Sequence, residues 1–329
     1  MMDPLNEMKT VIAVDPRSKT SPKHILDRWE SYMTIVRWND KKFMSKRWLP
    51  ENREQLHDGD TTAKFVLHRE RQRHFYPTCL AALRAVNRTW TTVIDIDEYA
   101  TINQNYAFRN ETKKQTQEQQ TTLLEVIKTP THHYDYTDSA CITMPRLRFG
   151  SHDNANKPDD ATLDDTTLGR NQVETIHLPK IGNHVFQESD FMTLRWHYRA
   201  NLHSKKDNRN PKSMVDVSAI KTQFSRQDTD AHRPVRSVCP KRNMYIQNKD
   251  SPFVVHHYTG TFEQYNFRND ARAGLKQRNP KRYKEYQNIH DAYDDTICGW
   301  IQSFVAAYGA EQANIWLAGV GNVSYAPPS

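Results

Sequence analysis

The segment VIDIDEY at positions 93–99 constrains the fold more than any other part of the chain, because an apolar run stops there on Asp95, Asp97 and Glu98. The β-branched and aromatic residues of 90–94 predict a buried strand. Alternate residues of a strand share a face, so Asp95 and Asp97 are expected on one face at its carboxyl end, where open α/β sheets bind ligands. Two adjacent carboxylates repel each other, and a divalent metal holding a phosphate relieves that repulsion most simply.

Asp-x-Asp spacing alone is a weak signal. The chain repeats it at Asp58/Asp60 and at Asp228/Asp230, both in stretches that are typical of polar loops. Only Asp95 and Asp97 follow a predicted core strand. The alternative is that these two acids are solvated and cap the next helix.

Composition narrows the class of protein. The 329 residues suffice for one large domain or two small ones, and the net charge of +7 favours an anionic partner. With 46 basic against 39 acidic residues the surface is mixed. Nucleic acid is possible on charge alone, but a nucleotide diphosphate fits as well, and no nucleic acid is expected among the partners. No apolar run reaches the roughly 18 residues of a membrane span, and the N-terminus lacks the apolar region of a signal peptide.

The four cysteines show no C-x-x-C spacing, which argues against a zinc ribbon or a redox motif. Cys141 and Cys239 could pair across the fold in an oxidising compartment. Four buried free thiols are the equally plausible alternative.

Apolar periodicity predicts an α/β order of elements. We expect strands at 10–15, 34–38, 90–94, 140–150, 191–198, 213–217 and 253–258. We expect helices opening at 21–22, over 61–86 with Pro77 as a kink or break, over 113–128, from 261 onward and over 293–317. Residues 151–185 have no sustained apolar period and are expected to form a surface insertion.

The strand at 253–258 ends in His256, His257 and Tyr258. Imidazole beside an Asp pair suits Mn²⁺, so one of the two histidines could complete a metal site; alternatively, one is packed in the core and the other is solvated. In the following helix, Arg268 and Arg272 are spaced to grip a diphosphate, although such a pair more often makes surface ion pairs.

Arg146 and Arg148, in the stretch before Gly150, have the same ambiguity: they could contact a ligand.

Competing chemistries find less support. The chain has no Walker loop, dinucleotide fingerprint, nucleophile elbow or H-E-x-x-H. A haloacid dehalogenase-type phosphatase would use Asp95 as nucleophile and Asp97 as acid, but Tyr99 departs from that motif. A non-catalytic module for polyanions is the other alternative, motivated by the net charge and by Tyr283, Tyr286 and Tyr293.

Four segments, NRTWTTVIDIDEYATIN, CITMPRLRFGS, PKSMVDVS and VVHHYTGTFEQYNFRNDAR, together resemble glycosyltransferase family 92 and the related family-2-like enzymes. The resemblance covers roughly residues 9–276 and is loose between these segments. It implies a GT-A fold, that is, a mixed, mostly parallel sheet flanked by helices, and a nucleotide-sugar donor held through Mn²⁺ or Mg²⁺. The chain looks as if it lacks the first strand of that fold, which puts binding of the nucleobase in doubt.

By the same resemblance, Asp95 and Asp97 would bind metal and diphosphate, Glu98 would support them, and His257 would be a further metal ligand. Lys212 falls near the expected donor site. The family implies UDP-galactose as the leading donor and a glycan or glycoprotein acceptor. It also implies a Golgi enzyme that is a type II membrane protein in its full-length form.

An inverting reaction needs a carboxylate to take the proton of the acceptor hydroxyl. Asp153, Glu263 and Asp270 are the candidates. Arg268 is the candidate for an additional contact to the donor. We expect residues 1–276 to form the glycosyltransferase-like domain and residues 277–329 to form a C-terminal helical extension.

Overall fold

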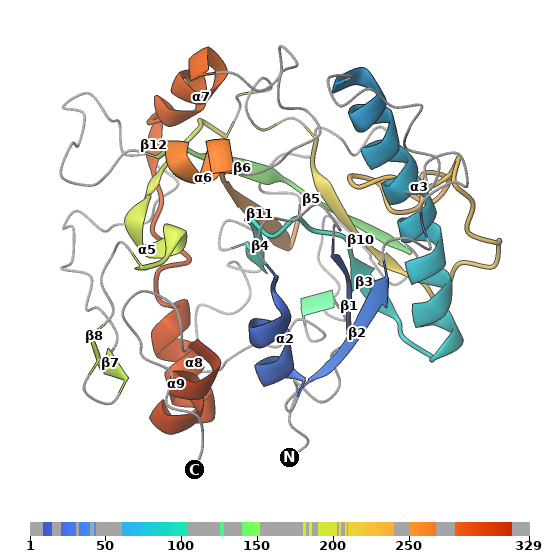
Figure 1. The fold of residues 1–329 in the computed structure, drawn as a ribbon, viewed down its shortest axis with the longest axis horizontal. Helices are drawn as coiled ribbons and strands as arrows, with labels where there is room; N and C mark the ends of the chain where they lie inside the picture. Colours follow the sequence, from blue (N-terminus) through green and yellow to red (C-terminus); the bar gives the residue numbers. More distant parts are fainter. Residues whose placement is uncertain are drawn as a thin grey trace.

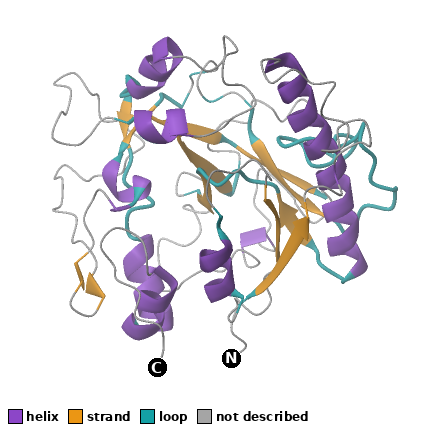
Figure 2. Ribbon diagram, in the orientation of Figure 1, coloured by secondary structure: helices purple, strands orange, loops and turns teal. Residues whose placement is uncertain are grey.

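The protein is a mixed α/β structure in which sheets lie at the centre and helices flank them (Figures 1 and 2). The computed structural model describes residues 9–14, 21–30, 33–39, 43, 61–103, 126–127, 140–151, 180–181, 184–185, 190–202, 204, 208, 210–239, 251–267 and 280–317. All structural statements below concern these residues.

The strands are β1 Lys9–Val14, β2 Thr34–Asn39, β3 Trp90–Thr92, β4 Glu98–Ile102, β5 Cys141–Met144, β6 Arg146–Phe149, β7 Lys180–Ile181, β8 His184–Val185, β9 Tyr198–Arg199, β10 Lys212–Asp216, β11 Phe253–Tyr258 and β12 Ala292–Tyr293. The helices are α2 Lys23–Trp29, α3 Thr61–Ala85, α5 Met192–Arg195, α6 Phe262–Phe267, α7 Pro280–Gln287, α8 Trp300–Tyr308 and α9 Ala310–Leu317.

Four sheets are formed by the described strands. Their orders are β1-β2, β3-β10-β5, β12-β9-β6-β11-β4 and β7-β8. Only the pairings β1 with β2 and β6 with β11 are parallel, and the other six described pairings are antiparallel. The expectation of a mostly parallel sheet is therefore wrong for this part of the chain, because neighbouring strands such as β4 and β11 run in opposite directions.

The first three elements confirm the predicted α/β beginning. Strand β1 pairs in parallel with β2, and α2 connects them. Helix α3 continues through Pro77, so this proline does not end the helix. Figure 1 shows α3 along one side of the central strands.

Pro145 divides the predicted strand at 140–150 into two. β5 pairs with β10 in the three-stranded sheet, whereas β6 pairs with β11 and β9 in the five-stranded sheet. Proline has no backbone N–H to donate to a ladder, and its carbonyl oxygen accepts from the backbone N–H of Val255 at 2.9 Å. The chain thus passes from one sheet to the next at the residue that cannot continue a strand.

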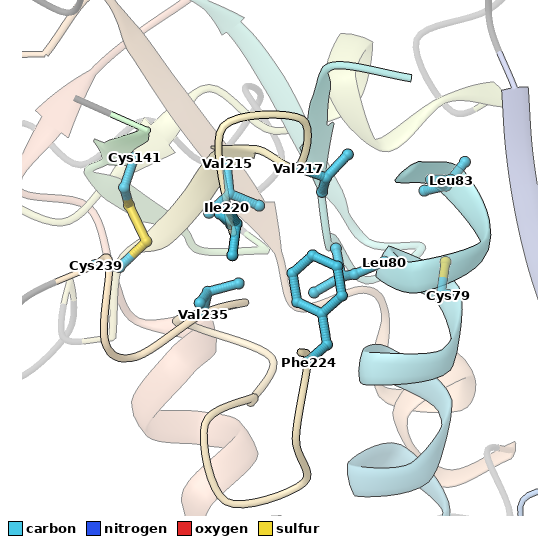
Figure 3. Packing of buried hydrophobic residues seen from close by; sticks show 10 residues of the cluster. All are labelled: Cys79, Leu80, Leu83, Cys141, Val215, Val217, Ile220, Phe224, Val235 and Cys239. Atoms are coloured by element: carbon cyan, nitrogen blue, oxygen red, sulfur yellow. A yellow bond between two sulfur atoms is a disulfide. The ribbon is translucent and has the colours of Figure 1, made fainter. Parts of the chain in front are cut away.

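A buried apolar cluster connects α3 with the three-stranded sheet (Figure 3). Its members are Cys79, Leu80, Leu83, Cys141, Val215, Val217, Ile220, Phe224, Val235 and Cys239. Cys141 of β5 and Cys239 form a disulfide with a Cα–Cα distance of 5.5 Å. This confirms the pairing that the sequence left open, while Cys79 and Cys298 are free and buried.

The segment expected as a strand at 191–198 is wrong in its first half. Residues Met192–Arg195 form the short helix α5, and only Tyr198–Arg199 form a strand. Leu194 is completely buried against Ile301 and Leu317 of the C-terminal helices, which explains why an apolar run here resembled a strand.

The C-terminal residues are not only helical. β12 pairs with β9, and Arg199 Nε lies 2.7 Å from Asp294 Oδ2 in a buried ion pair. The expected single helix at 293–317 is two helices that separate at Gly309, whose φ of 82° is a conformation that glycine adopts easily. Helix α9 packs on α2 through stacked rings of Trp29 and Trp316, 5.1 Å apart.

The remaining expectations at 113–128 and 151–185 lie largely outside the described residues. Among the helices that the structure does describe, none combines the length and the apolar character needed to cross a lipid bilayer.

Candidate functional site

Asp95 and Asp97 lie in a tight turn between two strands, and Glu98 is the first residue of the second strand. β3 ends at Thr92, and the backbone N–H of Glu98 donates to the carbonyl oxygen of Asp95 at 3.0 Å before β4 begins. The predicted extension of the first strand to 94 is therefore wrong. Asp95 and Asp97 point to different partners because the turn, and not the alternation of a strand, sets their directions.

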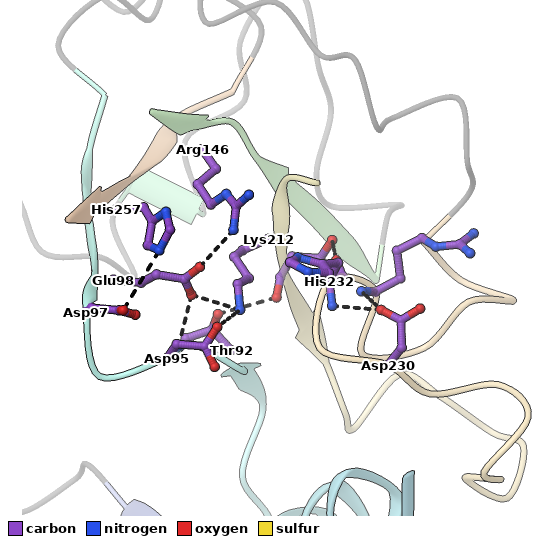
Figure 4. A network of polar contacts seen from close by, with 11 residues as sticks. Thr92, Asp95, Asp97, Glu98, Arg146, Lys212, Asp230, His232 and His257 are labelled. Carbon is purple, nitrogen blue, oxygen red and sulfur yellow. Dashed lines mark hydrogen bonds and ion pairs between the residues drawn. The ribbon is translucent and has the colours of Figure 1, made fainter. Parts of the chain in front are cut away.

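Lys212 of β10 gathers two of these acids. Its Nζ lies 2.8 Å from Glu98 Oε2 and 3.1 Å from Asp95 Oδ2 (Figure 4). The side chains of Lys212 and Glu98 are fully buried, whereas that of Asp95 is 54% exposed. Glu98 also accepts from the backbone N–H of Asp95 at 2.9 Å and from Arg146 at 3.3 Å. Glu98 thus fixes the turn from inside, and Asp95 remains accessible to a ligand.

Asp97 faces the next strand of the site. His257 Nε2 lies 3.9 Å from Asp97 Oδ2, and the backbone N–H of Tyr258 donates to the carbonyl oxygen of Asp97 at 3.0 Å. β11 also pairs His257 with Glu98 across the β4 ladder. The proximity of His257 to the acidic turn, which the sequence predicted, is confirmed for Asp97.

Electrostatics keep His257 neutral. Burial, with the positive charges of Arg146 and Arg148, lowers the pKa of His257 well below its ordinary value. A neutral imidazole can donate a lone pair to a metal ion at neutral pH. The neighbouring His256 points to the opposite side, where its ring stacks on Phe149 at 4.9 Å. One histidine is therefore in the core and the other borders the site.

The alternative that the acids cap a helix is wrong, because the chain continues into β4 and Asp97 is 7% exposed.

The Asp-x-Asp pair at Asp228 and Asp230 has a different role from Asp95 and Asp97. Asp230 accepts from the backbone N–H groups of His232 and Arg233, and Asp228 accepts from Ser237. Asp228 and Asp230 therefore stabilise turns of a polar loop, as the sequence predicted.

Asp97 and His257 could supply two ligands to a divalent ion. Asp97 Oδ2 and His257 Nε2, 3.9 Å apart, are closer than the roughly 4.2 Å that separates opposite ligands with bonds of about 2.1 Å. Nδ1 of His257 is buried without a hydrogen-bond partner. No group of three or more His, Cys, Asp or Glu within the described residues is gathered around one point, because Lys212 holds Asp95. A small cation commonly binds through one or two carboxylates, substrate phosphates and water.

Comparisons with known proteins add nothing to this geometry. No family model, curated protein or solved structure matches the chain. The family resemblance therefore stays a prediction that rests on the four sequence segments and on the order in which they contribute to the site.

Four of the predicted residues cannot be placed in the site. Asp153, Arg268 and Asp270 lie outside the described residues. Glu263 belongs to helix α6, which follows β11, but its side chain is not described.

Two residues near the site carried no signal in the sequence. The hydroxyl of Ser213, next to Lys212, donates to the carbonyl oxygen of His232 at 3.1 Å. Burial, together with Lys212 and Arg146, lowers the pKa of His232 to about 4. Burial also raises the pKa of Tyr76 in α3, with Asp95 as the next cause. His232 comes from a polar loop and Tyr76 from a long helix, so only the fold places them here.

Proposed function

We propose that the chain is a metal-dependent glycosyltransferase that moves a hexose, with galactose favoured, from a UDP-sugar to a glycan acceptor with inversion. The observation that carries the proposal is that Asp97 and His257 lie close together and that Lys212 contacts Asp95, although these residues come from three segments far apart in the sequence. Asp97 and His257 offer a carboxylate and an imidazole for Mn²⁺ or Mg²⁺. Lys212, which contacts Asp95, offers a cation for phosphate.

The residues have separable roles in this proposal. Asp97 and His257 would hold the ion, and Asp95 would join them when a ligand competes for Lys212. When bound, the ion supplies Lewis-acid stabilisation of the charge that develops on departing UDP. Within the described residues, the contacts of Glu98 are made to other protein groups. Glu98 therefore orients Lys212 and the turn. Asp153, Glu263 and Asp270 remain the candidate bases for the acceptor hydroxyl.

The disulfide supports a place in the secretory pathway. Disulfides persist in oxidising compartments, and Cys141–Cys239 joins β5 to the loop after β10. This is compatible with the Golgi lumen, which the family resemblance implies.

The two alternatives have less support from the described residues. A module that only binds polyanions predicts basic residues away from the acids, whereas Lys212 and Arg146 contact Glu98 directly. A phosphatase needs the Asp95 carboxylate as nucleophile, and Tyr99 stands where the motif of such enzymes normally has Thr or Val.

Release of UDP from UDP-galactose, with and without Mn²⁺, tests the proposal. Asp97→Asn removes the charge at nearly constant volume, and we expect at least a hundredfold loss of the Mn²⁺-dependent rate, since an electrostatic contact in an active site is commonly worth ~10²–10³ in rate. Asp228→Asn is the matched control, because it changes an acid of the second Asp-x-Asp pair that binds its own loop.

Equal UDP release by the wild type and Asp97→Asn would refute the mechanism. Hydrolysis of a phosphate monoester, lost in Asp95→Asn and with no UDP release, would support the phosphatase instead.

A further inference from the structure

Arg148 of β6 is a buried cation that contacts no carboxylate among the residues that the structure describes. Its residue is 8% exposed, and its Nε has no hydrogen-bond partner. The guanidinium carbon lies 4.2 Å from the centre of the Tyr286 ring, on α7. Within the described residues Arg148 makes no ion pair. Burying an unpaired charge is costly, and proteins retain such a charge rarely without a partner or a ligand.

The sheet places Arg148 in the candidate site. β11 lies between β4 and β6, and its register pairs His257 with Glu98 on one side and with Arg148 on the other. Residues paired across neighbouring strands share a face. Glu98, His257 and Arg148 therefore form one row on the face where Figure 4 shows His257 and Arg146 around Glu98. The opposite face carries the stacked rings of Phe149 and His256.

The acids nearby are already engaged. Glu98 contacts both Lys212 and Arg146, Asp95 contacts Lys212, and Asp97 faces His257. Burial lowers the pKa of Arg146, and the positive charge of Arg148 is the next cause. The two guanidinium groups thus repel each other, and within the described part of the chain only Arg146 of the two contacts a carboxylate.

We propose that Arg148 binds an oxyanion of the ligand, namely the diphosphate of the nucleotide. This inference rests on the proposed function for the identity of the ligand, but its geometry is independent. A guanidinium can grip two phosphate oxygens with parallel N–H groups. Tyr286 holds the plane of the guanidinium, so little side-chain entropy remains to be lost on binding.

Charge balance supports a diphosphate. In the described site, the three acids Asp95, Asp97 and Glu98 are matched in number by Lys212, Arg146 and Arg148. A divalent ion and the two negative charges of a bound UDP-sugar also cancel each other. The metal would approach the side of Asp97 and the phosphates the side of Arg148, on either side of His257.

Binding of inorganic pyrophosphate and of UDP, measured by calorimetry with and without Mn²⁺, tests the inference. Arg148→Gln should weaken both affinities by about tenfold to a hundredfold, since hydrogen bonds to charged groups are the strong ones. Arg148→Lys keeps the positive charge but loses the two parallel N–H groups. Its affinities should therefore lie between those of the wild type and those of Arg148→Gln. Glucuronate, an anionic sugar without phosphate, should bind equally weakly to the wild type and to Arg148→Gln.

The melting temperature of the ligand-free protein separates a binding role from a structural one. Arg148→Gln should leave it unchanged or raise it, because the variant removes an unpaired buried charge. Arg84→Gln is the control: Arg84 also lies over a ring, that of Phe224 at 4.6 Å, but donates to two backbone carbonyl oxygens. This control should melt lower and bind pyrophosphate normally.

Pyrophosphate affinity within twofold of the wild type in Arg148→Gln, or no pyrophosphate binding by the wild type, would overturn the inference. Glucuronate binding that depends on Arg148 more than pyrophosphate binding does would also overturn it. The outcome is independent of sugar transfer. A protein that binds pyrophosphate through Arg148 but releases no UDP contradicts only the proposed function.

Discussion

Replacing Lys212 by methionine should destabilise the protein strongly. The Nζ of Lys212 lies 2.8 Å from Glu98, and both side chains are fully buried. At an effective dielectric constant of about 20, the attraction at that distance is about 6 kcal/mol. Part of it is offset because the variant no longer buries an ammonium group. Removing one partner of a buried pair costs about 3–5 kcal/mol.

Glu98 keeps one other contact in the Lys212→Met variant. We therefore expect the loss in the free energy of unfolding to lie at the lower end of this range. Arg146 NH1 stays 3.3 Å from Glu98 Oε1 and retains part of the compensation. We therefore expect a loss of about 3 kcal/mol in the free energy of unfolding. For a protein of this size the melting temperature should fall by about 4 °C. Urea unfolding followed by circular dichroism measures the first quantity, and thermal unfolding measures the second.

Two further variants decide whether the ion pair is the cause. Lys23→Met removes an exposed pair with Asp27, in which the side chains are 73% and 42% exposed, and should not change stability measurably. Lys212→Met combined with Glu98→Gln should cost less than the sum of the single changes, because neither charge is left alone. A loss in Lys212→Met no larger than in Lys23→Met, or simple additivity in the double variant, would refute the reasoning.

Three other variants test the fold. Replacing Cys141 and Cys239 by alanine should cost about 2–5 kcal/mol of stability in urea, since their disulfide closes a loop of sequence separation 98; a count of four free thiols in the unreduced, denatured wild type would contradict this bond. Burial, together with Lys212 and Arg146, lowers the pKa of His232 to about 4. Below pH 6.5 the unfolded chain therefore binds more protons than the folded protein, and the free energy of unfolding decreases as the pH is lowered. His232→Gln should therefore lose roughly 2–3 kcal/mol less than the wild type between pH 7 and pH 4.5 in urea unfolding, and an equal loss in both would exclude His232 as a cause. Trp316→Ala should cost about 3–5 kcal/mol, because a ring that is 3% exposed leaves a cavity beside α2; unchanged urea unfolding would show that α9 does not stabilise the N-terminal elements.

Local sequence patterns predicted the elements that depend on local chemistry. Strands β2, β10 and β11 and helix α3 lie within one or two residues of the expected bounds, because their apolar and β-branched runs match the burial that they find. Period alone could not separate α5 from a strand, since four apolar-rich residues fit either element. Leu194 became helical through packing on Ile301 and Leu317.

The acidic turn shows the same limit at the site. The sequence identified Asp95 and Asp97, and the resemblance placed Lys212 and His257 near them. It assigned the two acids to one face of a strand, but the chain turns after Thr92 and sends them to different partners. The pairing of Glu98 with Lys212 joins residues far apart in the chain, so no local pattern could reveal it. Glu98 is consequently a residue that organises the turn.

Lys212 and Arg148 differ in whether they contact a carboxylate of the described site. Both are buried cations on strands of the same site, at 0% and 8% exposure. Lys212 has two carboxylates, so its removal should destabilise the ligand-free protein. Arg148 has none among the described residues, so its removal should not, although it should weaken pyrophosphate binding. Because burial and charge are alike, a loss of stability in Lys212→Met without a loss in Arg148→Gln would indicate that the partner anion makes the difference. Together with weaker pyrophosphate binding in Arg148→Gln, this contrast would identify Arg148 as a charge that is retained for a ligand.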